Sequence, residues 1–491
     1  MDYLDHKKQS RQRILLFTGY VLIACAIIIA AIILLYQSYG FGVNRKGVVT
    51  QNGLVFFSSH PAPADIYVNG QLKNVKTNTR LSLAAGVYNV KLSRTGYFDW
   101  TRAIEINGGD VQHFDYPFLF PKILSPKKLP VLPSSPSLLT QSPDNRWVLI
   151  QASANQREFL LYDIKNPDKP ATTITIPASI ISKAAAVESW QIDEWAVDNI
   201  HVVLQHNFDG RSEFVLINRE APDQTINLNN TLKISPNKLS LNDRKYDQYY
   251  IYDSTTLNLQ KVSLKNPTPV IAQSHVLNYK TYSDDTILYV TDQSTVKNKV
   301  AVKLLVGDNS YNIRNLSAGT TYVTDLTKYD GVMYVVVGSA ADNRAYIYRD
   351  PVGQHSAQPN LNPSTTQVLR VDGVNFVSFS PTAQFIMAEN GNNFGVYDIF
   401  NKAGYRYTTK STVDPPQIHS VWMDGNRLTY VSNGRLIVFD FDNTNLQQLM
   451  PASSNFLPAF SPDYKFVYSL APGTAVQTDF TQTSLRIPAD R

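Results

Sequence analysis

The sequence Ser-Pro-Asp-Asn-Arg-Trp-Val-Leu-Ile, residues 142–150, joins a polar turn to a strongly apolar strand. Two other segments follow the same plan: Ser-Pro-Thr-Ala-Gln-Phe-Ile-Met at 380–387 and Ser-Pro-Asp-Tyr-Lys-Phe-Val-Tyr at 461–468. Ser, Pro, Asp and Asn favour turns, whereas aromatic and β-branched side chains fit the pleated surface of a strand. The chain therefore repeats a turn–strand unit, and such internal repetition indicates a repeat architecture.

The spacing of this unit predicts the kind of repeat. Weaker copies open at residues 198, 243, 285, 330 and 424. The mean spacing is about 46 residues, and a four-stranded propeller blade needs about 40–50. We therefore expect an all-β propeller over residues 137–491. Eight units can close as eight blades, which we favour because we expect each terminal unit to contain all four of its strands. If the first and last units share one blade, seven blades result.

The three Ser-Pro copies resemble the blades of TolB-type and related WD-like propellers, in which a Trp-Ser-Pro-Asp-Gly turn precedes a strand. Only three of the eight units carry the turn clearly. The resemblance is therefore to an architecture and not to a particular protein.

Short strands of a different kind occupy residues 53–119. The segments 54–57, 66–68, 87–92 and 103–106 are apolar or alternate in polarity, and Gly-containing turns separate them. Several short strands without a helical period predict a small β-sandwich.

This region resembles a PEGA domain. The resemblance rests on His-Pro-Ala-Pro-Ala-Asp-Ile-Tyr-Val-Asn-Gly at 60–70, Leu-Ser-Leu-Ala-Ala-Gly-Val-Tyr-Asn-Val-Lys-Leu at 81–92, and Gly96-Tyr97. Ala62 and Pro63 replace the Glu and Gly of the tetrapeptide that names the family. The resemblance implies a cell-surface β module and no chemistry. Residues 120–136 are rich in proline and are expected to form a semi-rigid linker between the two domains.

An apolar run near the N-terminus predicts a membrane anchor. Residues 14–36 carry no charge and, as a helix, would span roughly 34 Å, enough for a bilayer core. Lys7, Lys8, Arg11 and Arg13 precede the run, so we expect residues 1–13 to be cytoplasmic and the rest, from a tether at 37–52 onward, to be extracytoplasmic. The alternative is a lipoprotein: residues 22–25 resemble a bacterial lipobox, but an apolar stretch follows Cys25 instead of a polar tether.

Composition excludes several classes of function. Charged residues make up 17% of the 491-residue chain, and 45 Lys+Arg against 40 Asp+Glu give a net charge of +5. A net charge this small does not provide the strongly basic surface that binds nucleic acid, so we expect no nucleic-acid partner. A single cysteine excludes a disulfide framework and a cysteine-based zinc site.

No catalytic, cofactor or metal site is predicted. The sequence holds neither a G-x-S-x-G elbow nor a kinase catalytic loop. His201 and His206 would project to opposite faces of one strand, and we expect both to be surface or loop residues. The acidic run 440–445 lacks the Gly and Glu of a calcium loop, so it predicts a turn. Four tryptophans are expected to pack between blades, with a sugar-stacking surface as the alternative: Trp147, Trp190, Trp195 and Trp422.

These observations favour a membrane-anchored interaction or scaffold protein that is not an enzyme and has no cofactor. Its propeller is expected to bind a protein or a cell-envelope glycan. The alternative is a propeller-type hydrolase or lyase acting on surface polysaccharide, with carboxylates brought together in the central channel from different blades.

Overall fold

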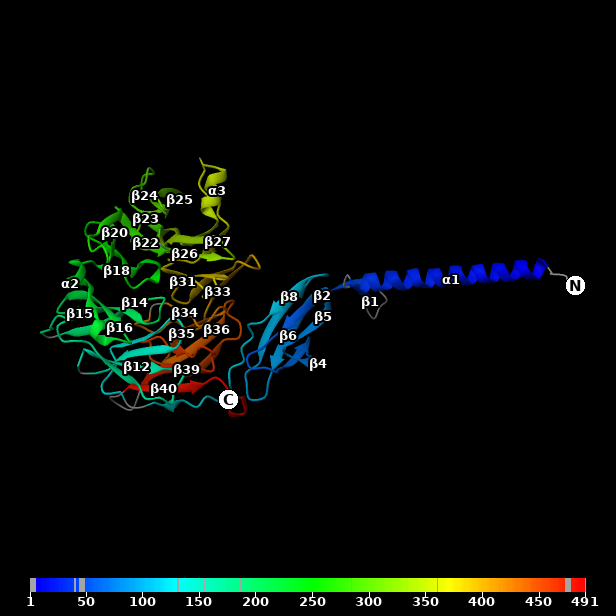
Figure 1. The fold of residues 1–491 in the computed structure, drawn as a ribbon, viewed down its shortest axis with the longest axis horizontal. Coiled ribbons are helices and arrows are strands. Elements are labelled where there is room, and N and C mark those ends of the chain that lie inside the picture. The colour runs from blue at the N-terminus through cyan, green and yellow to red at the C-terminus, as the bar shows by residue number, and fades with distance from the viewer. Residues whose placement is uncertain are drawn as a thin grey trace. The chain divides into compact units, whose positions relative to one another are not determined.

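A computed structural model describes residues 6–38, 41–43, 49–129, 132–153, 155–185, 187–283, 285–359, 361–417, 419–472 and 478–490. The chain divides into two compact units (Figure 1). One unit comprises Met1–Lys122 together with Pro488–Arg491, and the other comprises Ile123–Ile487.

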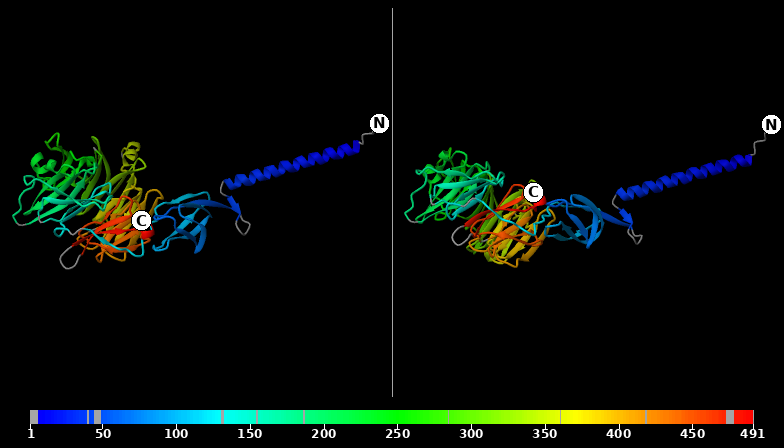
Figure 2. Two further views of the ribbon diagram at one scale, coloured as in Figure 1. Left: turned by 60° about the horizontal axis from the view of Figure 1, so that its bottom comes forward. Right: turned by 90° about the horizontal axis from the view of Figure 1, so that it is seen from below.

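The N-terminal helix α1 (His6–Ser38) is one unbroken helix in both views of Figure 2. Its segment Arg13–Tyr36 is long and apolar enough to cross a membrane, and none of it is buried. Burying so many apolar side chains in lipid removes them from water, which is favourable. An exposed helix of this kind at the N-terminus suggests a signal sequence or a membrane anchor.

The small β unit contains two four-stranded sheets within the described residues. Phe57, Ile66, Leu92 and Trp100 are almost fully buried and form its core. The first sheet consists of β1 (Phe41–Val43), β2 (Val49–Phe57), β5 (Thr79–Ala84) and β8 (Val111–Phe114), with β8 parallel to β2. The second consists of β3 (Asp65–Val68), β4 (Gln71–Lys76), β6 (Gly86–Ser93) and β7 (Trp100–Ile106).

The larger unit is a propeller whose sheets surround a common centre (Figure 1). In its described residues it contains eight four-stranded sheets, so the chain has the eight-bladed arrangement rather than seven. The first sheet consists of β10 (Leu138–Gln141), β11 (Trp147–Gln151), β12 (Glu158–Asp163) and β13 (Thr172–Thr175), and the second of β14 (Glu188–Trp195), β15 (His201–Phe208), β16 (Arg211–Asn218) and β17 (Ile226–Asn227). The third consists of β18 (Lys238–Leu241), β19 (Gln248–Asp253), β20 (Asn258–Ser263) and β21 (Val270–Gln273). The fourth consists of β22 (Val276–Tyr282), β23 (Thr286–Thr291), β24 (Lys299–Val306) and β25 (Asn309–Ser317).

The other four sheets continue the same order. They are β26 (Tyr322–Tyr329), β27 (Val332–Ser339), β28 (Arg344–Arg349) and β29 (Gln367–Arg370); β30 (Phe376–Phe379), β31 (Phe385–Asn390), β32 (Asn393–Asp398) and β33 (Ala403–Thr408); β34 (Val421–Trp422), β35 (Arg427–Ser432), β36 (Arg435–Asp440) and β37 (Gln447–Pro451); and β38 (Ala459–Phe460), β39 (Phe466–Pro472) and β40 (Thr478–Ser484) with β9 (Lys127–Lys128). Two short helices, α2 (Leu228–Leu232) and α3 (Pro351–Ala357), interrupt the connections.

The eighth sheet differs from the expectation that the last unit would supply four strands of its own. Its outer strand is β9, which lies in the proline-rich stretch that the sequence assigned to the linker. Lys128 pairs with Thr481 and Lys127 with Gln482, so the two ends of the propeller close in one sheet. A strand of two residues shows no alternation, which is why its pattern could not be recognised.

The repeated Ser-Pro turn has a physical role. In the first sheet the Ser142 side chain accepts a hydrogen bond from the backbone N–H of Trp147 at 2.9 Å, which closes the turn between β10 and β11. Ser461 accepts the same bond from Phe466 at 2.9 Å, and Ser380 accepts it from Phe385 at 3.2 Å. A side-chain hydroxyl thus fixes the first hairpin of three blades.

Candidate binding channel

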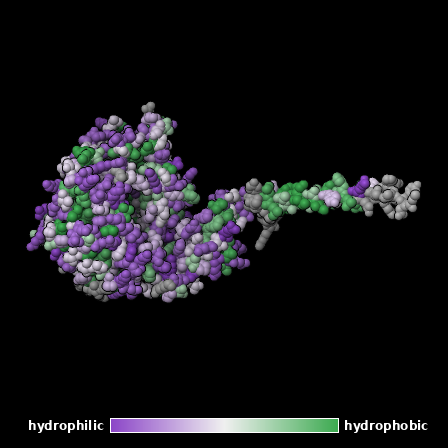
Figure 3. Space-filling model, in the orientation of Figure 1, coloured by the Kyte–Doolittle hydropathy of each residue, from purple (hydrophilic) through white to green (hydrophobic). Residues whose placement is uncertain are grey.

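The first strands of the blades lie around the centre of the propeller. β14 contacts β10 and β18, and β26 contacts β22 and β30, although these strands belong to different sheets. Since each blade begins at this inner position, residues far apart in sequence meet there, one or two from each blade. The face of the propeller seen in Figure 3 is hollowed near the middle.

One side of this channel is an uncharged cavity of about 840 Å³. β10, β14, β34, β38 and the segment before β38 line it, and no charged side chain is among the residues of the lining. Ile192 and Leu457 expose 42% and 46% of their surface, so the accessible part of the lining includes aliphatic groups. Exposed apolar side chains in a concave site favour a ligand with an apolar group.

The tryptophans of this region are mainly packing residues. Trp190 is 2% exposed, and its indole N–H donates to the Gln156 carbonyl at 3.1 Å. Trp195 is 4% exposed and donates to the Thr140 hydroxyl at 2.9 Å. Trp422, which is half-buried, lines the cavity and donates to Ser378. Because the Trp190 face is covered, it offers no platform on which a sugar ring could stack.

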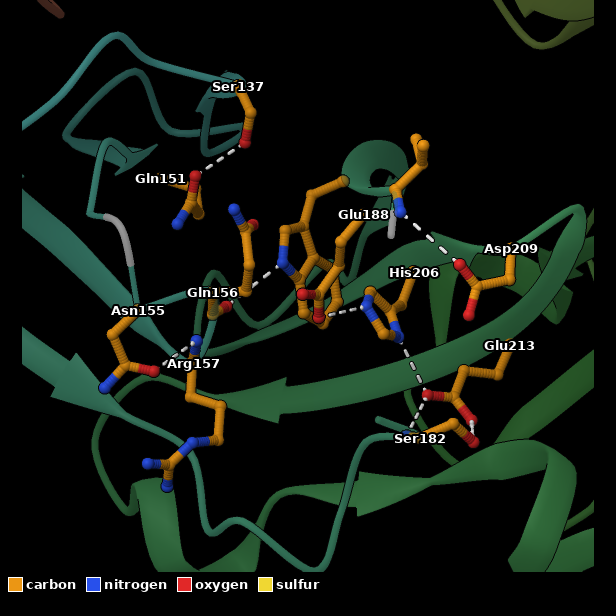
Figure 4. A network of polar contacts seen from close by, with 12 residues as sticks. Ser137, Gln151, Asn155, Gln156, Arg157, Ser182, Glu188, His206, Asp209 and Glu213 are labelled. Carbon is orange, nitrogen blue, oxygen red and sulfur yellow. Dashed lines mark hydrogen bonds and ion pairs between the residues drawn. The ribbon is translucent and has the colours of Figure 1, made fainter. Parts of the chain in front are cut away.

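The Trp190 ring packs against His206, with the ring centroids 4.6 Å apart. His206 belongs to a buried polar network that the sequence did not indicate (Figure 4). His206 is fully buried: its Nε2 lies 2.8 Å from Glu188 Oε1, and its Nδ1 lies 2.8 Å from Glu213 Oε1. Glu213 also accepts hydrogen bonds from the backbone N–H and hydroxyl of Ser182. Together with the His206 contact these bonds outweigh burial and lower the pKa of Glu213.

The expectation that both histidines are surface or loop residues is wrong for His206. Its position opposite Glu213 in the β15–β16 ladder places it between two carboxylates. These partners come from two neighbouring strands, and no local spacing signals them. His201 lies elsewhere, with its Nδ1 at 2.6 Å from Asp198 Oδ2.

The other side of the channel is charged. The first strands of four consecutive blades contribute Asp193 and Glu194 on β14, Lys238 on β18, Lys280 on β22 and Asp325 on β26. The Lys280 ammonium lies 3.5 Å from Asp325 Oδ1, and Glu194 Oε1 lies 3.9 Å from Arg244 Nε. Opposite charges from separate blades therefore partly neutralise one another here.

Asp193 is placed by an irregularity in its strand. The register between β14 and β15 shifts between Ile192 and Glu194, which leaves Asp193 without a cross-strand partner. Such a bulge re-aims one side chain relative to its neighbours, and bulges are frequent beside functional sites. Asp193 is therefore displaced from the regular alternation of β14.

The enclosed position of these groups shifts their pKa values. Burial, and secondarily the charge of Glu194, raises the pKa of Asp193 to about 8. Burial also raises the pKa of Glu194 and of Asp325, against the opposing effect of nearby cations. Desolvation lowers the pKa of Lys238, against the effect of Asp193. Asp193 is consequently protonated in most molecules at neutral pH.

The described residues contain no group of three or more His, Cys, Asp or Glu arranged to hold a metal ion. In the run 440–445 the side chains bond to one another: Asn445 donates to Asp440 at 2.9 Å, and Thr444 donates to Asp442 at 2.6 Å. In the weaker repeat that opens at residue 285, the Asp285 carboxylate Oδ1 lies 2.8 Å from the Lys261 ammonium. The preceding residue, Asp284, falls outside the described residues.

The fold and the channel define a class of protein: a small β-sandwich followed by an eight-bladed β-propeller, with one apolar N-terminal helix. The sandwich is a PEGA domain, because residues 52–119 match the model of that family. No curated protein matches the sequence.

Among solved structures, the Dos1 propeller is similar at 15% identity over 74% of this chain and 96% of that one, with a TM-score of 0.42. Kluyveromyces lactis Hsv2 is similar at 9% identity over 64% of this chain and 98% of that one, with a TM-score of 0.40. An oligogalacturonate lyase in complex with manganese is similar at 11% identity over 74% and 99%, with a TM-score of 0.40. Likenesses of this size support no functional assignment.

Proposed function

We propose that this chain is a membrane-anchored, extracytoplasmic interaction protein whose propeller binds a protein or a cell-envelope glycan, and that it is not an enzyme. Helix α1 would hold the chain in the membrane with a cytoplasmic N-terminus. The PEGA domain would act as a spacer, because it is a folded β-sandwich that lies between the helix and the propeller in the sequence.

The observation that carries this proposal is the channel at the centre of the propeller. It combines an uncharged cavity of about 840 Å³ with a group of charged residues on the first strands of four consecutive blades. A concave site with a few convergent polar groups is the usual form of a binding site. Rigid strands position these groups, so a ligand would meet a largely preformed surface.

Crosslinking on intact cells tests this function. A photoreactive amino acid at Gln191, which is exposed on β14 and lines the cavity, is expected to capture one predominant protein or glycan. The matched control places the same amino acid at Lys169, in the loop between β12 and β13. Recovery of only lipids and copies of this chain from both positions would contradict the proposal.

A hydrolase or lyase is the second candidate, because the first strands of two blades carry carboxylates, and the charge of Lys280 acts on both Glu194 and Asp325. Asp193, with its pKa of about 8, could act as a general acid, and Glu194 or Asp325 as the second carboxylate. Incubation of the purified chain with acidic and neutral polysaccharides would reveal shortened or unsaturated products. If Asp193→Asn does not abolish any cleavage seen, the channel is not its site.

A further inference from the structure

Three buried polar atoms without a hydrogen-bond partner in the described structure meet on one side of the channel: Asp193 Oδ2, Ser240 Oγ and Tyr279 OH. Tyr279 is 6% exposed, and the Ser240 hydroxyl lies beside its hydroxyl. The charge of Asp193 acts on both Tyr279 and Lys238. Buried polar groups are almost always paired, so three together indicate a missing partner.

The same place holds a lysine that is free to bind. The Lys238 ammonium lies 4.8 Å from the centre of the Tyr279 ring. The residue as a whole is exposed, although desolvation lowers the pKa of its ammonium. Within the described part of the chain, no carboxylate lies within 4.0 Å of it, whereas Lys280 is paired with Asp325. Its favourable contact is therefore with the face of an aromatic ring, which leaves its N–H donors available.

Donors outnumber acceptors in this group at neutral pH. With a pKa of about 8, Asp193 carries a proton that it can donate. The hydroxyls of Ser240 and Tyr279 can also donate, and Lys238 adds a positive charge. Such a set fits an anionic oxygen ligand, because hydrogen bonds to an ionised acceptor are the stronger ones.

The uncharged cavity begins one residue away, since Ile192 lines it and Asp193 follows. We propose that the two together form a peptide-binding channel. In it, Lys238 and the hydroxyls of Ser240 and Tyr279 contact a carboxylate, and the cavity takes the adjacent apolar side chain. This inference rests on the proposed binding function and narrows the partner to a protein with an acidic residue next to an apolar one.

A peptide fits this site better than a carboxylate-bearing glycan. The most exposed apolar side chains of the cavity are the aliphatic ones of Ile192 and Leu457, whereas its aromatic residues are buried or half-buried. Aliphatic contacts suit leucine-like side chains, whereas sugar rings are held mainly by open aromatic faces.

The test uses the full chain in detergent, immobilised and exposed to two pools of random hexapeptides. One pool has Leu-Glu fixed at its centre and the other has Leu-Gln. Retained peptides are counted by mass spectrometry. We expect the Leu-Glu pool to be enriched by about tenfold, the effect of one hydrogen-bonded charge.

Two variants locate the binding. Lys238→Met removes the charge, and Tyr279→Phe removes the hydroxyl but keeps the ring; both are expected to abolish the preference for Leu-Glu. Tyr279→Phe also removes an unpaired buried hydroxyl, so its melting temperature should equal or exceed that of the unchanged chain. The matched control, Lys169→Met in the exposed loop between β12 and β13, should retain the preference.

Equal retention of both pools, retention of neither, or insensitivity to Lys238→Met would overturn the inference. Retention of an oligomer of uronic acid in place of both peptide pools would also overturn it. If the peptides fail while crosslinking on cells still captures a protein, the partner binds elsewhere and the proposed function stands. If crosslinking yields only lipid and self-contacts, the proposed function fails as well.

Discussion

Glu389 on β31 is a carboxylate whose pKa is raised by burial and lowered by hydrogen bonds. It is fully buried, and its oxygens accept bonds from the backbone N–H and the hydroxyl of Ser420, the latter at 2.7 Å. Burial outweighs these bonds and raises the pKa of Glu389 from 4.5 to about 7. The protonated form is therefore favoured in the folded chain.

This shift predicts how stability depends on pH. Because the folded pKa lies above the unfolded one, the contribution of Glu389 is fully present below about pH 4.5 and is lost as the pH rises through about 7. Between pH 5 and pH 8 the free energy of unfolding should fall less in Glu389→Gln than in the unchanged chain. The difference between the two falls should reach up to about 3 kcal/mol. Thermal melts across this range measure the difference. An unchanged pH profile in Glu389→Gln would contradict the shift, and Glu220→Gln, with a side chain 55% exposed, is the matched control.

Single residues of the channel could not be recognised from the sequence. Lys238, Lys280 and Asp325 lie on three different strands, more than 40 residues apart, so they form no motif. Their proximity depends on the ring of blades, which brings the first strand of each repeat to the centre. For the same reason His206 gave no sign of its two carboxylate partners.

At the scale of elements, the closure of the propeller depends on β9. Leu129, directly after this strand, donates its N–H to the Phe480 carbonyl at 2.9 Å, and its side chain packs against the core of the first and last blades. Because the last blade is completed by residues that precede the first, this contact joins the two ends of the ring.

Leu129→Pro is therefore expected to destabilise the propeller beyond the loss of the side chain. The substitution removes the backbone donor, and Leu129→Ala keeps it while removing most of the leucine side chain. Leu129→Pro should lower the free energy of unfolding by about 1–3 kcal/mol more than Leu129→Ala does. Urea denaturation followed by tryptophan fluorescence measures both. Equal destabilisation would show that β9 does not hold the ring closed.

At the scale of the whole molecule, the orientation of the chain in the membrane is open to direct measurement. In a chain with Cys25→Ser, a single cysteine replaces Asp168, whose side chain is 95% exposed in the propeller. A second chain places the cysteine at Ser10 in the N-terminal part of α1. We expect a membrane-impermeant maleimide to label the first chain on intact cells, and the second only after permeabilisation.

Labelling of Ser10→Cys on intact cells would reverse the proposed orientation. A mature chain that lacks α1 would identify the helix as a signal sequence instead of an anchor. A lipid on Cys25 of the unsubstituted chain, detected by mass spectrometry, would favour the lipoprotein alternative.

The sequence by itself determined the apolar helix, the PEGA domain and the propeller class, because each depends on a local pattern: an uncharged run, alternating strands between glycine turns, and a turn repeated about every 46 residues. Only the tertiary structure decided that β9 completes the eighth blade and that a charged group and an uncharged cavity meet at the centre. Pairing between chain ends and convergence of distant strands are non-local, and they leave no spacing in the sequence from which they could be predicted.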